Sequence, residues 1–444
     1  MMLTLLGFGM ILTFMVLIMT KRLSPLIALI IVPITFAVAA GFAPKLSPMM
    51  LSGIKSIAPT GVLLMFAILY FGVMIDAGLF DPLIRVLLKV MKGDPLRVVV
   101  GTAVLALIVS LDGDGSTTYM ITVSALLPLY LRLGMRPLVM VCVIFIANGV
   151  MNITPWGGPT SRVAAALHLD AGAIFVPMLP IIVAGACTVL AIAWLLGRGE
   201  RRRLGKLALV PKHLRTEVAP CLDQDGQLPS IQPADDTKRP RLIWINATLT
   251  FVLMATLVAD IVPIPVLFMV AAALALLINY PHLPDQRQRI AAHAENILAV
   301  VSIIFAAGIF TGILSGTGMI QAMSHAVLAM LPPSFGPYLA PITALLSLPF
   351  TFFLSNDAFY YGVVPIIAQV AGTYGITPLE IARASLIGQP VHLLSPLVPS
   401  TYLLVGLASV DFGDHQRFAF KWTLLVCALM FAAGLSFVVF PFAR

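Results

Sequence analysis

Apolar runs separated by short polar stretches occupy most of the chain. The hydrocarbon core of a bilayer is about 30 Å thick, so a helix of roughly 20 apolar residues crosses it. We predict full spans at residues 2–20, 24–43, 60–80, 137–167, 173–196, 242–261, 263–280, 297–316, 379–408 and 418–440. The pattern therefore predicts an all-α polytopic membrane protein.

Two further apolar stretches are each interrupted by a polar apex. The segment SLDGDGSTTY separates residues 97–111 from 117–131, and the segment FLSNDAFY separates residues 338–354 from 358–372. Each piece is short for a crossing helix. Irregular backbone at membrane depth persists only where protein or a wet cavity satisfies its polar groups. We therefore predict two re-entrant hairpins that each return to the side they left.

The chain also repeats itself. Residues 133–160 can be aligned with residues 374–401, and the matched positions are always 241 apart. The matched pairs are Gly134 with Gly375, Pro137 with Pro378, Pro155 with Pro396, and Thr160 with Thr401. Each half then holds about five spans, and an odd number turns the second half upside down relative to the first. Inverted repeats with interrupted helices are typical of secondary transporters.

We therefore divide the chain into an N-terminal half at residues 1–196, a basic linker at 197–241 and a C-terminal half at 242–444. Each half is one inverted repeat with a re-entrant hairpin and an interrupted helix. The linker begins with the basic cluster RGERRR and continues with aspartates and prolines, a composition typical of a solvated tether.

Composition and charge support a membrane location. Sixty per cent of residues are apolar and 10% are charged, against about a quarter charged in a soluble domain. The formal net charge is +8. The Lys and Arg residues lie at the ends of apolar runs rather than in a basic patch with interleaved aromatics, which argues against nucleic acid as a partner. With the N-terminus outside, all but five of the 27 Lys and Arg residues fall on one side, as expected of the cytoplasmic side. We expect a multi-pass protein of the cell (inner or plasma) membrane with a cytoplasmic linker.

Four helix interruptions carry the candidate chemistry. Besides the two hairpin apices, these are the breaks NITPWGGPT at residues 152–160 and LLSPLVPST at 393–401. Proline stops the backbone hydrogen-bond ladder, which frees N–H and C=O groups in mid-membrane. Helix N-termini at such breaks attract anions, and freed carbonyls and hydroxyls suit cations. The arrangement favours a carrier of a negatively charged metabolite rather than an enzyme with catalytic residues.

Charged and titratable residues near the interruptions have alternative interpretations. Asp112 and Asp114 are expensive to bury without a proton, a cation or donors, although the apex is also compatible with a solvated turn. Arg162 follows GGPTS and is placed either to bind a carboxylate in a bidentate pair or to extend to the membrane interface. His392 precedes a break and is a candidate for proton coupling or a neutral packing residue. Asp76 is another intramembrane acid, for which Arg97 is a possible partner.

The chain resembles the CitMHS family of citrate–metal:proton symporters, within the ion transporter superfamily. The segments that carry the resemblance are SLDGDGSTTYMITVSALLPLYLRLGM, NGVMNITPWGGPTSR, FLSNDAFYYGV and GQPVHLLSPLVPSTYLLVGLASVDFGDHQRF. The superfamily usually shows Ser-Asn-Thr at both apices, whereas Asp112-Gly113-Asp114 and Ser355-Asn356-Asp357 stand here. This departure makes a simple sodium site doubtful, and the extra carboxylates suit a substrate that brings a metal cation.

The resemblance implies uptake of citrate as a complex with a divalent cation of the Mg²⁺ or Ca²⁺ class, by symport with protons. It also implies a homodimer in the lipid bilayer, with a scaffold and a moving transport domain, and no permanently bound cofactor. On this basis the metal of the complex is assigned to Asp112, Asp114 and Asp357, and proton coupling to His392, Asp114 and Asp76. Citrate is assigned to Ser116, Thr117, Asn152, Thr154, Gly157, Gly158, Thr160, Arg162, Ser355, Asn356, Ser395, Ser400 and Thr401.

Two other functions are compatible with parts of the pattern. One is a carrier of free di- or tricarboxylate, or an ion antiporter, of the same superfamily. The other is an intramembrane aspartyl protease with Asp76 and Asp114 as its dyad. The protease hypothesis is weak because the chain lacks a Gly-x-Gly-Asp run and because catalysis does not explain the inverted duplication.

Overall fold

The computed structural model describes residues 2–444 except residues 21, 92, 114, 205–236 and 260. Asp114, a candidate for both metal binding and proton coupling, therefore lies outside the described residues, as does most of the predicted linker. The regular secondary structure of the described part of the chain is helical throughout.

The first half contains helices up to the start of the linker. They are α1 Met2–Met19, α2 Pro25–Ala39, α3 Leu46–Asp76, α4 Asp81–Met91, α5 Pro95–Val109, α6 Gly115–Arg132, α7 Pro137–Met151, α8 Gly158–Leu167, α9 Ala171–Phe175 and α10 Leu179–Leu204. Short 3₁₀ turns join some of them, namely η1 Ala43–Lys45, η2 Ser110–Asp112 and η3 Val176–Met178.

The second half follows the same order. Its helices are α11 Ile243–Val258, α12 Ile264–Asn279, α13 Leu283–Gly316, α14 Met319–Met330, α15 Leu339–Phe353, α16 Val364–Gly372, α17 Pro378–Ser385, α18 Gln389–His392, α19 Pro399–Leu407 and α20 Phe412–Ser436. Two 3₁₀ turns, η6 Pro240–Leu242 and η7 Pro333–Tyr338, and a π-helical segment, η8 Ala358–Val363, complete it.

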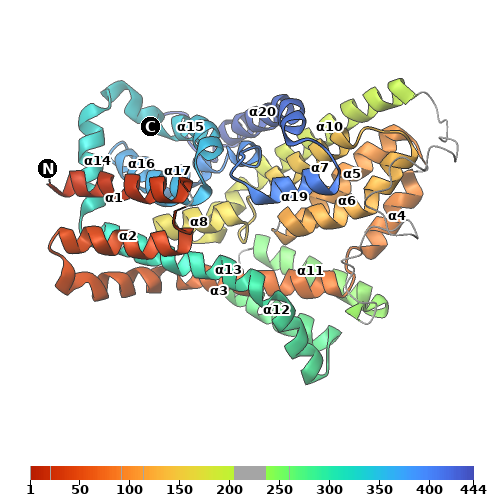
Figure 1. Cartoon of the computed structure of the whole chain (residues 1–444), viewed down its shortest axis with the longest axis horizontal. Coiled ribbons are helices and arrows are strands. Elements are labelled where there is room, and N and C mark those ends of the chain that lie inside the picture. Colours follow the sequence, from red (N-terminus) through yellow and green to blue (C-terminus); the bar gives the residue numbers. More distant parts are fainter. Residues whose placement is uncertain (1, 21, 92, 114, 205–236, 260) are drawn as a thin grey trace.

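The helices form two layers (Figure 1). Helices α2, α3, α11, α12 and α13 form one, the long-helix layer, in which α3 packs against both α12 and α13. Helices α5 to α8, α10 and α15 to α20 form the other, the hairpin layer. Helix α4 connects the layers at one end of the molecule and α14 connects them at the opposite end.

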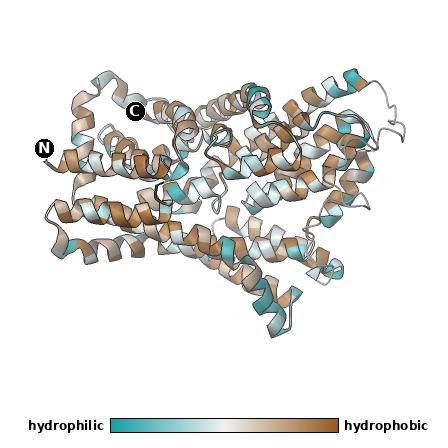
Figure 2. Cartoon of the chain, viewed as in Figure 1, coloured by the Kyte–Doolittle hydropathy of each residue, from teal (hydrophilic) through white to brown (hydrophobic). Residues whose placement is uncertain are grey.

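The layers are built for a membrane. Among the described residues, seven helical stretches are long and apolar enough to cross a bilayer. Shorter apolar helices are found in α1, α2, α7, α12, α14 and the segment of η8 and α16. Figure 2 shows hydrophobic residues along most of the helices and strongly hydrophilic residues in a few places, among them the far end of α10 and the connection between α12 and α13. Both chain termini lie at one end, and the described ends of the linker region lie at the other (Figure 1). The chain is therefore a multi-pass membrane protein.

Both predicted hairpins are present as helix pairs that meet at the polar apices, and both interrupted helices are confirmed. Helices α5 and α6 form the first hairpin, and α15 with η8 and α16 forms the second. The predicted span at 137–167 is interrupted between α7 and α8. The span at 379–408 is interrupted twice, because residues 386–388 separate α17 from α18 before the predicted break.

The sequence-based prediction was wrong about the starts of α3 and α13, and it missed the helices α4 and α14 that follow them. It began the spans in α3 and α13 at residues 60 and 297, whereas these helices begin at Leu46 and Leu283. It also omitted α4 and α14. The polar first turns of α13 and the charged face of α4 lower their local hydropathy, and a search for apolar runs therefore passes over them.

Helices α3 and α13 approach each other through glycines. A Cβ atom on Gly312 would lie 2.9 Å from the Cα of Gly53, so neither position has room for a side chain. Gly308, Gly312 and Gly316 recur every fourth residue along this face of α13, which is the small-residue spacing that lets membrane helices pack closely. The long-helix layer is therefore a tightly packed scaffold.

The two interrupted helices cross at equivalent positions of the repeat. A Cβ atom on Gly149 in α7 would lie 2.8 Å from the Cα of Pro390 in α18. These residues are 241 apart, the spacing of the repeat alignment. A contact between a residue and its own equivalent lies on the axis that relates the halves. The pseudo-two-fold axis therefore passes through this crossing.

Candidate functional site

Local backbone chemistry shapes the two hairpin apices. The first turns at Gly113, whose φ of +79° favours glycine because L side chains rarely adopt it. In the second, the Ser355 hydroxyl accepts a hydrogen bond from the Ala358 amide at 3.2 Å and so caps the following helical turn. That turn continues as η8, and π-helical segments of this kind occur frequently at functional sites.

The breaks in the two interrupted helices are held by different contacts. Helix α8 begins at Gly158 with Pro159 in its first turn, where proline costs no hydrogen bond. In the second half, the Thr401 hydroxyl donates to the Leu393 carbonyl at 2.7 Å across the break. The Ser395 hydroxyl accepts from the Leu397 amide at 3.2 Å. Each break therefore has a defined geometry within the hairpin layer.

Each hairpin apex meets the interrupted helix of the other half. Arg162 in α8 donates from Nε to Asp357 Oδ1 at the second apex, at 2.6 Å. The side chains of Arg162 and Asp357 are only 20% and 10% exposed. At the first apex, a Cβ atom on Gly115 would lie 3.5 Å from the Ser400 hydroxyl of α19. The site is thus assembled from both halves, with one buried ion pair at its centre.

Each half contains an equivalent hydrogen bond between an amide side chain and a tyrosine, and the sequence analysis missed these residues. The Asn148 amide donates to the Tyr119 hydroxyl at 2.9 Å, and the Gln389 amide donates to the Tyr360 hydroxyl at 2.7 Å. Both amides and both tyrosines are 241 residues apart. Each bond ties the second arm of a hairpin to the interrupted helix of its own half. The repeat spacing itself was the signal that could have identified these residues.

The site contains buried polar atoms without hydrogen-bond partners among the described residues. They are Thr154 Oγ1, Thr160 Oγ1, Tyr361 OH and Gln389 Oε1. An unsatisfied buried group costs about 1–3 kcal/mol. Such atoms can donate to, or accept from, the oxygen atoms of a polar ligand. Thr154 and Thr160 belong to the predicted substrate set, whereas Tyr361 and Gln389 do not.

The first apex contacts both its own half and the long-helix layer. Thr118 donates to Asp112 Oδ1 at 3.4 Å, and Asp112 is 7% exposed. The alternative of a solvated turn is therefore wrong for Asp112. The Trp156 indole donates to the Leu111 carbonyl at 2.9 Å. Its ring packs against Phe71 of α3 and Phe268 of α12, with centroids 5.3 and 4.9 Å away.

The two other candidates for proton coupling lie in different environments. His392 is buried, and its Nδ1 is 2.6 Å from the Thr351 carbonyl oxygen. A carbonyl only accepts, so Nδ1 carries the proton.

Asp76 belongs instead to the contact between α3 and α13. Its carboxylate is 3.1 Å from Arg289 and 2.9 Å from His293. The suggested partner was wrong, because Arg97 lies 3.8 Å from Asp94. Asp76 is thus part of an ion-pair network within the long-helix layer.

The predicted substrate residues at the four interruptions differ in how far they are buried. The buried ones are Thr154, Gly157, Thr160, Ser395 and Thr401, and the partly exposed ones are Ser116, Thr117, Asn152, Gly158, Ser355, Asn356 and Ser400. Asn356 Oδ1 accepts from the Gln389 amide at 3.2 Å. The amide of Gln389 therefore connects the second apex, Tyr360 and the interrupted helix.

Comparisons with known proteins agree with this architecture. Residues 14–388 match the model of the CitMHS family, described as citrate transporter. A Bacillus subtilis protein named "Citrate transporter" is 55% identical over 441 residues, covering 99% of this chain and 100% of that protein. Another from the same organism, named "Mg(2+)/citrate complex secondary transporter", is 52% identical and covers 98% of each chain.

Solved structures show the same fold at low sequence identity. The Alcanivorax borkumensis YdaH transporter aligns with a TM-score of 0.57 and 13% identity, covering 90% of each chain. The Neisseria gonorrhoeae transporter MtrF aligns with a TM-score of 0.61 and 15% identity, covering 89% of this chain and 84% of that one.

Proposed function

The chain belongs to the CitMHS family of citrate transporters, and from that premise we propose that it takes up citrate as a complex with a divalent cation, by symport with protons. The observation that carries the proposal is the buried pair of Arg162 and Asp357 at the junction of the two halves. A relative at 52% identity is named as a carrier of the Mg²⁺–citrate complex.

The substrate matches the charges of this pair. A metal–citrate complex presents carboxylates and a cation side by side. Arg162 suits a carboxylate, with which guanidinium forms bidentate hydrogen bonds, and Asp357 suits a Mg²⁺- or Ca²⁺-class cation, which prefers oxygen ligands. When the complex enters, each buried protein charge exchanges one partner of opposite sign for another. The exchange avoids an isolated buried charge, which costs several kcal/mol.

Polar groups around the pair would orient the complex. The Thr160 hydroxyl lies in the first turn of α8, a ten-residue helix whose N-terminal end favours negative charge. The Thr154 hydroxyl lies in the break that precedes this helix. We assign them to citrate oxygens together with the hydroxyl and amide groups of the other interruptions. Asp112 and Asp114 remain assigned to the cation, with most of its ligands supplied by citrate.

Proton coupling and movement complete the proposal. We assign proton coupling to His392, which is buried and precedes the break between α18 and α19, and Asp114 is the second candidate. Asp76 is a weaker candidate for the proton carrier, because its carboxylate already pairs with Arg289 and His293. The hairpin layer would move against the long-helix layer in an elevator mechanism, with α4 and α14 as connections. The superfamily favours a homodimer.

Uptake assays test the metal requirement directly. The purified protein is reconstituted in proteoliposomes, and labelled citrate uptake under an inward proton gradient is measured with EDTA, Mg²⁺, Ca²⁺ or Mn²⁺. The proposal predicts uptake only with a divalent cation. Uptake that persists undiminished in EDTA would identify a carrier of free di- or tricarboxylate instead.

A matched pair of variants locates the site. Arg162→Gln should abolish metal-dependent uptake. Arg97→Gln removes one positive charge from an exposed pair outside the site and should transport like the wild type. Equal uptake by the two variants would show that Arg162 does not bind the substrate.

A further inference from the structure

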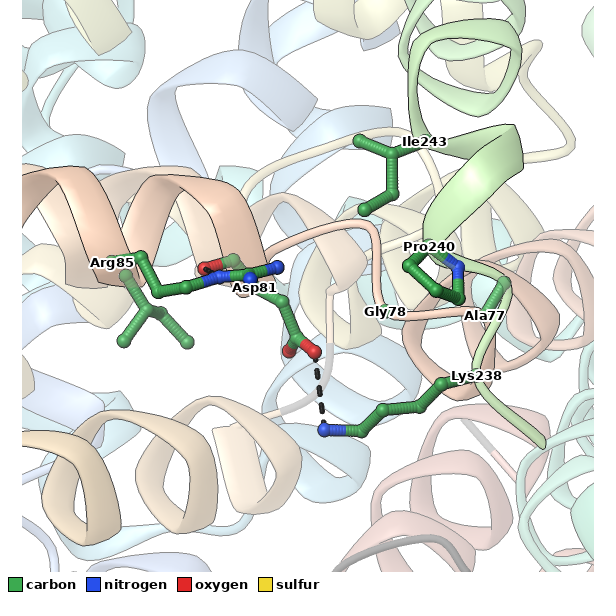
Figure 3. Close-up of a pocket in the computed structure, with 8 residues that line it drawn as sticks. Ala77, Gly78, Asp81, Arg85, Lys238, Pro240 and Ile243 are labelled. Carbon is green, nitrogen blue, oxygen red and sulfur yellow. Dashed lines mark hydrogen bonds and ion pairs between the residues drawn. The ribbon is translucent and has the colours of Figure 1, made fainter. Parts of the chain in front are cut away.

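A pocket lies where α4 connects the two layers, near the described ends of the linker region. Its volume is about 600 Å³, and it is lined by Ala77, Gly78, Asp81, Ile84, Arg85, Lys238, Pro240 and Ile243. These residues come from the end of α3, from α4, and from the segment that leads into α11 (Figure 3). The pocket is separate from the four interruptions that form the transport site.

The segment that closes this pocket is anchored to the scaffold. The Arg239 amide donates to the Ala77 carbonyl at 3.0 Å, and Arg239 Nε donates to the Asn279 carbonyl at 2.9 Å. The same guanidinium lies 4.8 Å from the ring centroid of Tyr280, whose hydroxyl donates to the Thr237 carbonyl at 2.9 Å. These contacts fix the backbone on both sides of Lys238.

The charge of the pocket is positive. Lys238 lies 3.1 Å from the Asp81 carboxylate (Figure 3). Arg85 lines the same pocket, and its Nε donates to the Asp81 backbone carbonyl at 3.3 Å. Two cations therefore face one carboxylate, and the Arg85 guanidinium remains exposed. An anionic group between Arg85 and Lys238 would complete the charge balance.

Large apolar side chains are exposed beside the pocket, as at a membrane interface. Trp244, which follows Ile243 in the chain, is 84% exposed, and exposed tryptophans concentrate at the level of lipid headgroups. On α4, Val86 and Val90 are both more than half exposed. The side chain of Ile84 joins this apolar surface to the pocket itself. A ligand that is both anionic and apolar fits this combination.

We propose that the pocket binds an anionic phospholipid, with its phosphate between Arg85 and Lys238 and its acyl chains along Ile84, Ile243 and Val86. Basic pockets between membrane helices are suited to anionic headgroups. Because α4 connects α3 of the long-helix layer to α5 of the hairpin layer, a lipid bound here contacts the joint between them. Transport rate then depends on the anionic lipid of the bilayer.

Lipid binding is tested without citrate, so its outcome is independent of the proposed transport function. Native mass spectrometry and thermal unfolding of the detergent-solubilised full chain are measured with phosphatidylglycerol, phosphatidylcholine or soluble glycerol phosphate. The wild type should retain phosphatidylglycerol and be stabilised by it alone. Equal retention of both lipids would overturn the proposal. Stabilisation by glycerol phosphate to the same extent would also overturn it, because the site would then bind a soluble anion.

Charge-matched variants locate the lipid. Arg85→Gln with Lys238→Gln should weaken phosphatidylglycerol binding about thirtyfold, as expected when two cations near a lipid phosphate are removed. Arg132→Gln with Arg417→Gln removes the same charge from exposed positions that do not line the pocket and should leave binding unchanged. If the first double variant is not monodisperse, Arg85→Gln alone provides the comparison. Unchanged binding in the Arg85 variants would contradict the proposal.

Discussion

Neutralising one member of the Arg162–Asp357 pair should destabilise the protein more than neutralising both. The Nε–Oδ1 distance is 2.6 Å, and both side chains are mostly buried, so water screens the pair poorly. Removing one partner of a buried pair costs about 3–5 kcal/mol, because the other charge is left uncompensated. Arg162 keeps 20% of its side chain exposed, and we therefore expect the lower end, about 3 kcal/mol, for Asp357→Asn.

The double variant separates stability from transport. Arg162→Gln with Asp357→Asn leaves no isolated charge, and we expect it to recover about 2 kcal/mol as the interaction energy of the pair. Its citrate uptake should nevertheless stay at background, because both groups that exchange partners with the metal–citrate complex are gone. Stability recovered without transport is therefore the signature of a pair that is both structural and functional.

Equilibrium unfolding of the detergent-solubilised protein in SDS, followed by tryptophan fluorescence, measures the cycle. The control is the Arg201–Asp94 pair, whose arginine side chain is 43% exposed and which should contribute less than about 1 kcal/mol. Strictly additive losses in the Arg162–Asp357 cycle would refute the reasoning, as would single-variant losses as small as those of the control.

Three further predictions address other parts of the structure. Gln389→Leu leaves the Tyr360 hydroxyl and Asn356 without their donor and should lower uptake about 5- to 150-fold, which corresponds to a loss of about 1–3 kcal/mol. A transport rate within twofold of the wild type would exclude a positioning role. His392→Gln should abolish accumulation driven by a pH gradient while citrate exchange at equal pH continues, and retained pH-driven accumulation would remove His392 from the proton path. Gly113→Ala should destabilise the protein in SDS unfolding, because a Cβ atom would lie 2.6 Å from the Trp156 ring at a φ of +79°. An unchanged unfolding midpoint would contradict that geometry.

Features encoded by local chemistry were predictable from the sequence. The hairpins and breaks were recognisable because glycine, proline and carboxylates interrupt apolar runs. The inverted repeat was recognisable because residues 133–160 align with residues 374–401 at a constant spacing of 241. Helix α4 was not recognisable, because an amphipathic helix at the interface lacks a continuous apolar run. The polar first turns of α13 carry Arg289 and His293, which pair with Asp76 of α3 in the folded protein. This contact joins segments far apart in the sequence, and an analysis of local hydropathy does not detect it.

Contacts between residues of the two halves could not be predicted by considering each position separately. Arg162 and Asp357 were both selected as site residues, for a carboxylate and for a metal, but only the fold reveals that they bind each other. The sequence analysis did not select Gln389. Its equivalence to Asn148, together with that of Tyr360 to Tyr119, follows from the 241-residue spacing and acquires meaning from the two matching hydrogen bonds.

The central claim is that citrate and a divalent cation cross the membrane as one complex. Proteoliposomes loaded with the purified chain are given labelled citrate together with a labelled divalent cation, and both fluxes are measured in the same vesicles. The account predicts equal initial rates for cation and citrate, and loss of both in Asp357→Asn. Citrate uptake without accompanying cation, in the wild type, would contradict it.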